Sequence, residues 1–206
     1  ALDPAAVRGI YQAKGRPPTN PVIVHVASLD QARELASDWP VNATRLASQL
    51  WPGPLSLVVP RSNAVPDIVT AGGSTVALRI PDHPVAQALL REARLPLAAP
   101  SANRSNQLSP TLAEHVLRDL DGRIDLILDA GPTRGGIEST VVDVTSDPPR
   151  LLRPGLISLP TLRTVLGTVE FLPPVLADLP IPSPGMLARH YAPRTPMELL
   201  VEYPLA

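Results

Sequence analysis

The sequence predicts an α/β fold with a mixed, twisted sheet flanked by helices, and two observations support this prediction. Short apolar runs typical of strands alternate with segments that carry helix-capping signals along most of the chain. In a chain of 206 residues, a hydrophobic content of 44% is also enough to build one substantial core. We therefore expect one α/β domain over residues 1–169.

Local signals define the elements expected in the first half of this domain. Asp3 and Pro4 are typical of a helix start, and Ser28 with Gln31 forms a capping box. The Trp51-Pro52-Gly53-Pro54 run should end a helix before the next strand. The helices are expected at 4–15, 28–37 and 44–50, and the strands at 22–26, 55–59 and 75–80.

The same reasoning continues through the second half. Asp82 is expected to cap a helix that ends near Arg94, Ser109 with Pro110 to start a helix that ends at Leu120, and Ser158 to open a helix that ends near Gly167. The apolar runs at 97–99, 124–128, 140–144 and 151–153 are expected to be strands.

Beyond Val169 the composition changes. Five prolines between 173 and 184 exclude regular helix or sheet, so residues 170–196 are predicted to be an extended linker. The linker contains Arg189, His190 and Tyr191, a cluster that a spacer does not need, and we expect it to fold over a ligand site as a lid. The alternative is a simple tether. Residues 197–206 resemble the start of an incomplete C-terminal domain.

Charge and composition exclude several classes of function. A formal net charge of −1 provides no global field for nucleic acid, so no stable nucleic-acid complex is expected. The chain has no cysteine, which excludes thiol catalysis and thiolate metal sites. No apolar run is long enough to span a membrane, and no signal peptide is present, so a cytoplasmic protein is expected.

The segment from Lys14 to His25 is the strongest candidate for a ligand site. Lys14 and Arg16 flank Gly15, prolines stiffen the turn, and the following apolar strand carries His25. Converging cations on such a turn would suit a polyphosphate. By itself, however, the pattern also fits a surface turn with two solvated cations.

Four other segments place polar groups at expected strand ends, where α/β proteins build their sites. The first carries Arg79, whose planar guanidinium suits a carboxylate but would also suit an ion pair. The second holds Ser101 and Asn103 in a turn that a capping role would equally explain. The third, 135–140, is either an anion-binding nest or a glycine hairpin, and the fourth ends at Arg153.

No nucleotide-binding glycine motif, histidine pair at metal spacing or nucleophile elbow is present in the sequence. Phosphoryl or nucleotidyl transfer catalysed by positioned cations is therefore the chemistry that fits best.

The order of these segments closely resembles the YrdC/Sua5 family of L-threonylcarbamoyladenylate synthases. The resemblance covers nearly the whole chain, and its last motif, which follows the linker, is similar to the longer Sua5 type. The matching motifs are KGRPPTNPVIVH, WPGPLSLVV, VALRIPDHPVA, LAAPSANRSNQLSPT, GRIDLILDAGPTRGGIESTVVDV, LLRPG and RHYAP.

The resemblance implies a YrdC-like sheet and an activity. Threonine and bicarbonate would form N-carboxythreonine, which attacks the α-phosphate of ATP to give threonylcarbamoyl-AMP and pyrophosphate for the t6A modification of tRNA. Mg²⁺ is expected as the phosphate counterion, without an all-protein metal cage or an organic cofactor. The product would pass to the tRNA threonylcarbamoyl-transfer machinery.

The resemblance also implies roles for individual residues. The catalytic tetrad would be Lys14, Arg16, Ser101 and Asn103. The ATP contacts would be Arg16, Asn20, Thr75, Ser101, Ser109, Arg153 and Tyr191, and the threonine contacts His25, Arg79, Ala99 and Ser139.

Two departures from the family pattern stand out. The family's N-terminal strand and its P-T-E-T-x-Y-G-L segment are expected before Ala1, and Asn106 stands where a glycine is usual. Two alternatives remain open: a carbamoyl-phosphate-dependent carbamoyltransferase domain, and a non-catalytic RNA-binding module of the same fold. The near-neutral charge disfavours the second alternative.

Overall fold

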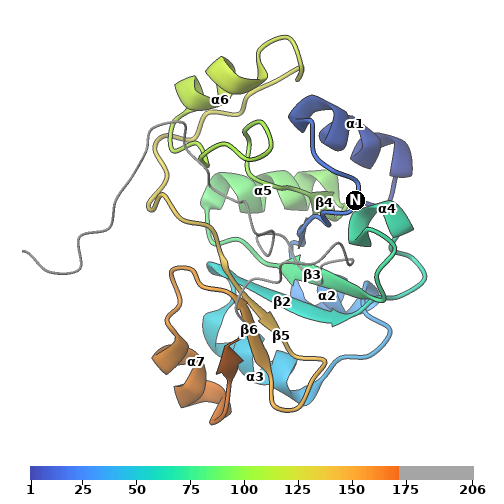
Figure 1. Cartoon of the computed structure of the whole chain (residues 1–206), viewed down its shortest axis with the longest axis vertical. Helices are drawn as coiled ribbons and strands as arrows, with labels where there is room; N and C mark the ends of the chain where they lie inside the picture. The colour runs from blue at the N-terminus through green and yellow to red at the C-terminus, as the bar shows by residue number, and fades with distance from the viewer. Residues whose placement is uncertain (172–206) are drawn as a thin grey trace, which may run out of the picture.

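A computed structural model describes residues 1–171 as a seven-stranded mixed sheet flanked by helices (Figure 1), which confirms the predicted fold class. The strand order is β4-β1-β3-β2-β5-β6-β7. The strands are β1 Val24–His25, β2 Leu55–Pro60, β3 Thr75–Arg79, β4 Leu97–Ala98, β5 Thr140–Asp143, β6 Arg150–Arg153 and β7 Glu170–Phe171. The helices are α1 Pro4–Lys14, α2 Leu29–Glu34, α3 Val41–Leu50, α4 Asp67–Thr70, α5 Pro84–Ala93, α6 Ala113–Leu120 and α7 Leu159–Leu166.

The strand register brings several predicted site residues to one edge of the sheet. In the parallel pair β1–β3, His25 lies opposite Arg79 at the ends of both strands. Because β2 runs antiparallel to β3, it starts beside the end of β3, and its first residue Leu55 pairs with Thr140, the first residue of β5. The last residue of β6, Arg153, returns to the same edge. Mixed strand directions therefore place the polar strand ends together.

The two faces of the sheet differ. One face carries the main core, to which α2, α3 and α7 contribute Ala32, Leu46 and Leu162, and α3 and α7 lie in the lower part of Figure 1. The other face carries only a small cluster of Ile23, Val58, Ala77, Val141 and Leu152. His25 and Arg79 project from this second face. They lie two residues after Ile23 and Ala77 of the small cluster, and side chains two residues apart on a strand share a face. The second face is thus the one with room for a site.

The helix predictions are largely confirmed. Asp3 caps α1, Ser28 caps α2 by accepting a hydrogen bond from the Gln31 amide, and Ser158 caps α7. Gly15 ends α1 in the left-handed conformation that glycine adopts without steric cost. Helix α2 ends at Glu34, earlier than expected, and α3 begins at 41 rather than 44.

Two predicted helix starts are wrong. Helix α5 is capped by His83, whose Nδ1 accepts from the Val85 amide, rather than by Asp82. Helix α6 begins at Ala113 rather than at Ser109. The Thr111 carbonyl accepts a hydrogen bond from the Thr133 amide, so a loop contact replaces the expected first turn.

The strand predicted at 124–128 is also wrong. Residues 125–128 have no regular structure, and Leu126 and Leu128 are exposed. The run has the composition of a strand, but no strand within residues 1–171 pairs with it. Strand β7, in contrast, forms at the first two residues of the predicted linker by pairing with β6.

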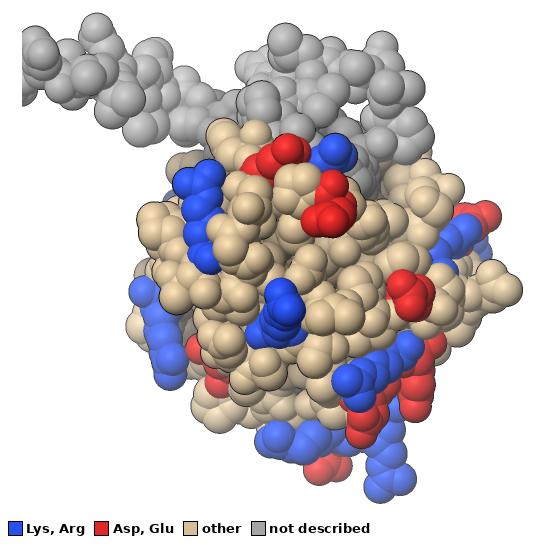
Figure 2. Space-filling view, turned by 90° about the horizontal axis from the view of Figure 1, so that it is seen from below, with Lys and Arg blue, Asp and Glu red and all other residues tan. Residues whose placement is uncertain are grey.

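The remaining residues of the linker, the Arg189–Tyr191 cluster and the segment 197–206 lie outside the described residues. Within residues 1–171, no helix is long and apolar enough to cross a membrane. On the face shown in Figure 2, basic and acidic side chains are interspersed among neutral residues, and no extended surface of one sign is visible there.

Candidate functional site

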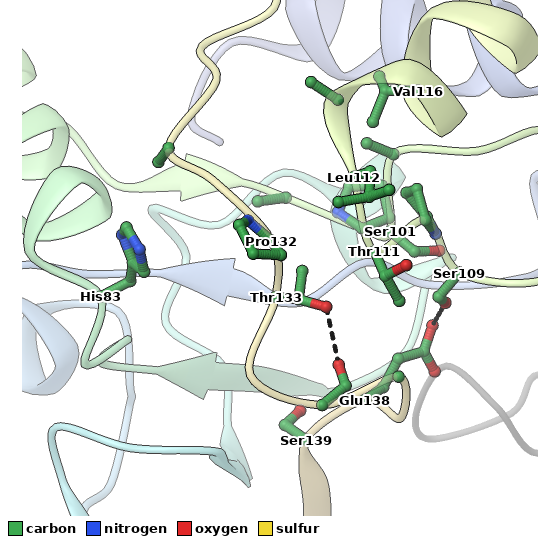
Figure 3. Close-up of a pocket in the computed structure, with 18 of the residues that line it drawn as sticks. His83, Ser101, Ser109, Thr111, Leu112, Val116, Pro132, Thr133, Glu138 and Ser139 are labelled. Carbon is green, nitrogen blue, oxygen red and sulfur yellow. Dashed lines mark hydrogen bonds between the residues drawn. The ribbon is translucent and has the colours of Figure 1, made fainter.

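A cavity of about 460 Å³ lies over the second face of the sheet, between the strand ends and the segments on both sides of α6 (Figure 3). Its polar lining comes from five separate parts of the chain. The predicted site residues that line it are Arg16, His25, Arg79, Ala99, Ser101, Ser109, Ser139 and Arg153.

Lys14 lies behind this lining and holds it in shape. Its ammonium group donates to the carbonyls of Ser101 and Asn103 and to Asn103 Oδ1, the last at 3.1 Å. The Asn103 amide group in turn donates to the Gln107 and Leu108 carbonyls, both at 2.8 Å. Burial, together with the charge of Arg16, lowers the pKa of Lys14 to about 8. Lys14 thus fixes the turn that presents Ser101 to the cavity.

Arg16 reaches the cavity from the turn after α1. Its Nε donates to the Asn20 carbonyl at 2.9 Å, and its Nη2 donates to Asn20 Oδ1 at 2.7 Å and to the Pro21 carbonyl. Tyr11 anchors the same turn through a 2.9 Å hydrogen bond to the Asn20 carbonyl. All these acceptors are neutral oxygens, so the positive charge of Arg16 is held in place without being neutralised by them.

Arg79 and His25 form the opposite part of the lining. Arg79 Nε donates to the Gly53 carbonyl at 2.9 Å. A Cβ at position 53 would lie 2.4 Å from the Leu50 carbonyl oxygen, so the turn that presents this acceptor requires glycine. His25 Nδ1 is buried and has no hydrogen-bond partner among the described residues. Burial and the nearby Arg79 charge lower the pKa of His25 to about 3, so the imidazole is neutral near pH 7.

Arg153 joins β6 to the start of β5. Its Nε donates to the Ser139 carbonyl and its Nη2 to Ser139 Oγ, both at 3.0 Å, and its Nη1 pairs with Glu138 Oε2 at 3.0 Å. Gly155 makes this junction possible, because a Cβ there would lie within 2.4–2.7 Å of backbone atoms of residues 138–140. The 135–140 segment is therefore part of the site wall.

The structure does not bring every predicted residue to the cavity surface. Lys14, Asn20 and Asn103 are buried behind it and act on residues that line it. Thr75 and Arg79 are on the same face of β3, but Thr75 is the first residue of the strand and Arg79 the last. Four residues correspond to about 13 Å along a strand. Thr75 does not line the cavity. Tyr191 lies outside the described residues.

Sequence reasoning did not single out Glu138, which lines the cavity. This carboxylate accepts a 2.8 Å hydrogen bond from Ser109 Oγ and also pairs with Arg153. Its position between two glycines and two hydroxyl residues was visible in the sequence, but its partners come from distant segments. Behind the Ser109–Glu138 contact, a second and wider cavity of about 1140 Å³ adjoins the first.

The fold and the site together define an α/β protein whose polar strand ends converge with three arginines on one cavity, a class suited to anionic ligands. A model of the Sua5/YciO/YrdC family, described as telomere recombination, matches residues 1–155. The chain belongs to this family.

Two curated relatives agree with this membership. The threonylcarbamoyl-AMP synthase of Pyrococcus abyssi is 47% identical over 206 residues, covering 99% of this chain and 60% of that protein. The threonylcarbamoyl-AMP synthase of Bacillus subtilis is 50% identical over 198 residues, covering 94% of this chain and 57% of that protein. This chain thus spans less than two thirds of the length of these relatives.

Solved structures give the same result. The crystal structure of Pyrococcus abyssi Sua5 complexed with L-threonine matches with a TM-score of 0.91 and 48% sequence identity. The match covers 94% of this chain and 57% of that chain.

Proposed function

We propose that this chain is the catalytic unit of an L-threonylcarbamoyladenylate synthase, which makes threonylcarbamoyl-AMP and pyrophosphate from threonine, bicarbonate and ATP. The observation that carries the proposal is the convergence of Arg16, Arg79 and Arg153 on one cavity in a protein of this family. The naming of the Pyrococcus abyssi and Bacillus subtilis relatives as threonylcarbamoyl-AMP synthases supports it.

Threonine is assigned to the β1–β3 end of the cavity. Arg79 suits the amino-acid carboxylate, because its guanidinium donates two parallel hydrogen bonds in one plane. Neutral His25 lines the same end of the cavity. Ala99 and Ser139 complete this end of the cavity. The solved Pyrococcus abyssi Sua5 complex with L-threonine supports an amino-acid subsite.

ATP is assigned to the remaining lining. Arg16 and Ser101 are placed at the phosphates, and Ser109 and Arg153 at the far end of the nucleotide. Asn20 takes part by holding Arg16, and Lys14 and Asn103 by holding the Ser101 turn. Thr75 and Tyr191 remain predicted ATP contacts that rest on the family resemblance alone.

The proposed reaction needs positioning and charge stabilisation more than proton transfer. The threonine nitrogen first adds to bicarbonate with loss of water, giving the carbamate. A carbamate oxygen then bonds to the α-phosphorus of ATP while the bond to the β-phosphate oxygen breaks, and pyrophosphate leaves. Arg16 would stabilise the negative charge that develops on the phosphoryl oxygens.

A divalent cation fits this proposal as a counterion of the substrate. No group of three or more His, Cys, Asp or Glu residues that could hold a metal ion occurs within residues 1–171. We therefore propose that Mg²⁺ enters with ATP and is bound mainly by phosphate oxygens and water. The expected compartment is the cytoplasm, and the expected recipient of the product is the machinery that transfers the threonylcarbamoyl group to tRNA.

The decisive experiment is mass spectrometry of a reaction of the complete protein with ATP, Mg²⁺, threonine and isotope-labelled bicarbonate. The proposal expects threonylcarbamoyl-AMP that carries the label, with one pyrophosphate per product. Omission of threonine or of bicarbonate should abolish both products. Product formation from carbamoyl phosphate instead of bicarbonate would favour the carbamoyltransferase alternative, and the absence of any adenylate would contradict the proposal.

A further inference from the structure

Glu138 stands between two residues assigned to ATP and contacts both of them. Its Oε1 accepts from Ser109 Oγ at 2.8 Å, and its Oε2 lies 3.0 Å from Arg153 Nη1. The Glu138 side chain is 19% exposed, and Glu138 lines the cavity. Figure 3 shows the Ser109–Glu138 pair at one end of the site, with His83 at the other.

Glu138 makes the surroundings of Arg153 and Arg16 different, although its charge acts on both guanidinium groups. The positive charge of Arg153 is matched by Glu138, whereas the side-chain N–H groups of Arg16 donate to neutral oxygens of Asn20 and Pro21. A phosphate close to Glu138 would be repelled by it. The polyphosphate of ATP is therefore expected at the Arg16 guanidinium, and the nucleoside is expected beside Glu138.

The hydrogen bond between Ser109 and Glu138 also determines whether Ser109 can donate or accept a hydrogen bond toward the cavity. A carboxylate accepts hydrogen bonds and donates none, so the single hydroxyl hydrogen of Ser109 is directed to Glu138. Ser109 Oγ consequently offers only lone pairs to the cavity. The Ser109–Glu138 pair thus requires a ligand group that donates a hydrogen bond, and an ionised phosphate has no hydrogen to donate.

Two groups of the nucleoside can donate, the ribose hydroxyls and the adenine amino group. An amino group only donates and would face the Arg153 guanidinium, which also only donates. A hydroxyl both donates and accepts, so it suits an edge where a carboxylate and a guanidinium lie side by side. Leu112, Val116 and Pro132 line the same cavity and give the base an apolar surface.

We propose that Glu138, acting together with Ser109, recognises a ribose hydroxyl of ATP and makes the site selective for ribonucleotides over deoxyribonucleotides. This inference rests on the proposed function and adds a specificity-determining residue to it. A site built to hydrogen-bond a hydroxyl discriminates against the analogue that lacks it, because the polar groups of the site are then left unpaired.

The test is calorimetric titration of the complete protein with ATP, 2′-deoxy-ATP and 3′-deoxy-ATP. Wild type should bind at least one deoxy analogue about tenfold more weakly than ATP, the size expected for one hydrogen bond to a charged group. Equal dissociation constants for all three nucleotides would overturn the inference.

Two variants test whether Ser109 and Glu138 cause any preference for ATP over its deoxy analogues. Ser109→Ala removes the hydroxyl and leaves the Glu138–Arg153 ion pair in place, so it should fold. Glu138→Gln keeps the side-chain volume, but its amide oxygen would accept from Arg153 and its amide nitrogen would donate to Ser109, which reverses the polarity of the hydroxyl. In both variants, ATP should bind about as weakly as the deoxy analogue.

Thr111→Val is the matched control, because Thr111 lines the same cavity and its hydroxyl faces His115 rather than Glu138. This variant should keep the wild-type preference. If Ser109→Ala and Glu138→Gln kept it as well, the inference would be wrong. Failure of folded wild type to bind ATP at all is a different result, and it would overturn the proposed function together with the inference.

Discussion

Lys14 and Arg153 are both buried cations of the site, but they are held by opposite kinds of partner. Lys14 donates to two carbonyls and an amide oxygen, whereas Arg153 pairs with the Glu138 carboxylate. Within residues 1–171, Arg16, two residues after Lys14, therefore has no carboxylate hydrogen-bonded to it and can bind an incoming anion, whereas the charge of Arg153 is matched by Glu138. The charge of the hydrogen-bond partners thus decides whether a buried cation contributes positive charge to a site or mainly stabilises the structure around it.

The largest expected effect concerns the positively charged end. Arg16→Ala and Lys14→Ala should each reduce threonylcarbamoyl-AMP synthesis by about 10²–10³-fold, because the first removes a cation needed where charge develops and the second releases the turn that presents Ser101. The measurement is the initial rate with saturating substrates. Arg8→Ala, on the exposed side of α1, is the control and should not change the rate. Wild-type turnover in either site variant would contradict this assignment.

Substitution of Arg153, whose charge is matched by Glu138, should lower the stability of the fold. Arg153→Met leaves the Glu138 carboxylate without its charged partner, and we expect the free energy of unfolding to fall by about 3 kcal/mol, as for other broken buried ion pairs. Chemical denaturation measures this change. The double variant Arg153→Met with Glu138→Leu should recover part of the loss. No recovery would mean that Arg153 stabilises the fold through its contacts with Ser139 instead.

A smaller and more selective effect is expected at the threonine end. Arg79→Lys keeps the charge but loses the planar fork, so the threonine dissociation constant should rise about tenfold while that of ATP changes much less. Separate titrations with each ligand distinguish the two affinities. Arg91→Lys, on the exposed side of α5, serves as the control. An equal loss for both ligands would assign Arg79 a structural role.

The last effect is a dependence of stability on pH. Burial lowers the pKa of Lys14 from 10.5 to about 8, so between these values the unfolded state binds more protons than the folded state. The free energy of unfolding should therefore rise with pH in this range, by less than about 1.4 kcal/mol per pH unit. Lys14→Met should lack this contribution. Parallel pH profiles for wild type and variant would show that the Lys14 amine does not titrate there.

The sequence was sufficient to predict the fold class and most helices, because caps such as Ser28 and Ser158 act within a few residues of their targets. It was less successful where a distant partner decides the structure. The run 124–128 has the composition of a strand but finds no strand to pair with within residues 1–171. The start of α6 shifted because Thr111 bonds to Thr133 instead of entering the helix.

The same distinction applies to the site. Single motifs allowed a surface turn at 14–16 and a hairpin at 135–140, and the family resemblance selected eight of the residues that line the cavity. Glu138 was missed because its role depends on Ser109 and Arg153, which approach it only in the folded chain. The burial of Lys14 behind the cavity surface is likewise a tertiary property that no local pattern contains.

The buried Nδ1 of His25, which has no hydrogen-bond partner among residues 1–171, lowers the stability of the fold. A buried polar atom without a partner costs the fold about 1–3 kcal/mol. A movement of the ring that brought this atom to a hydrogen-bonding group of a ligand would recover that free energy, which would then appear as binding affinity. His25 therefore makes the fold less stable than an apolar side chain of the same shape would, and a bound ligand would relieve this deficit.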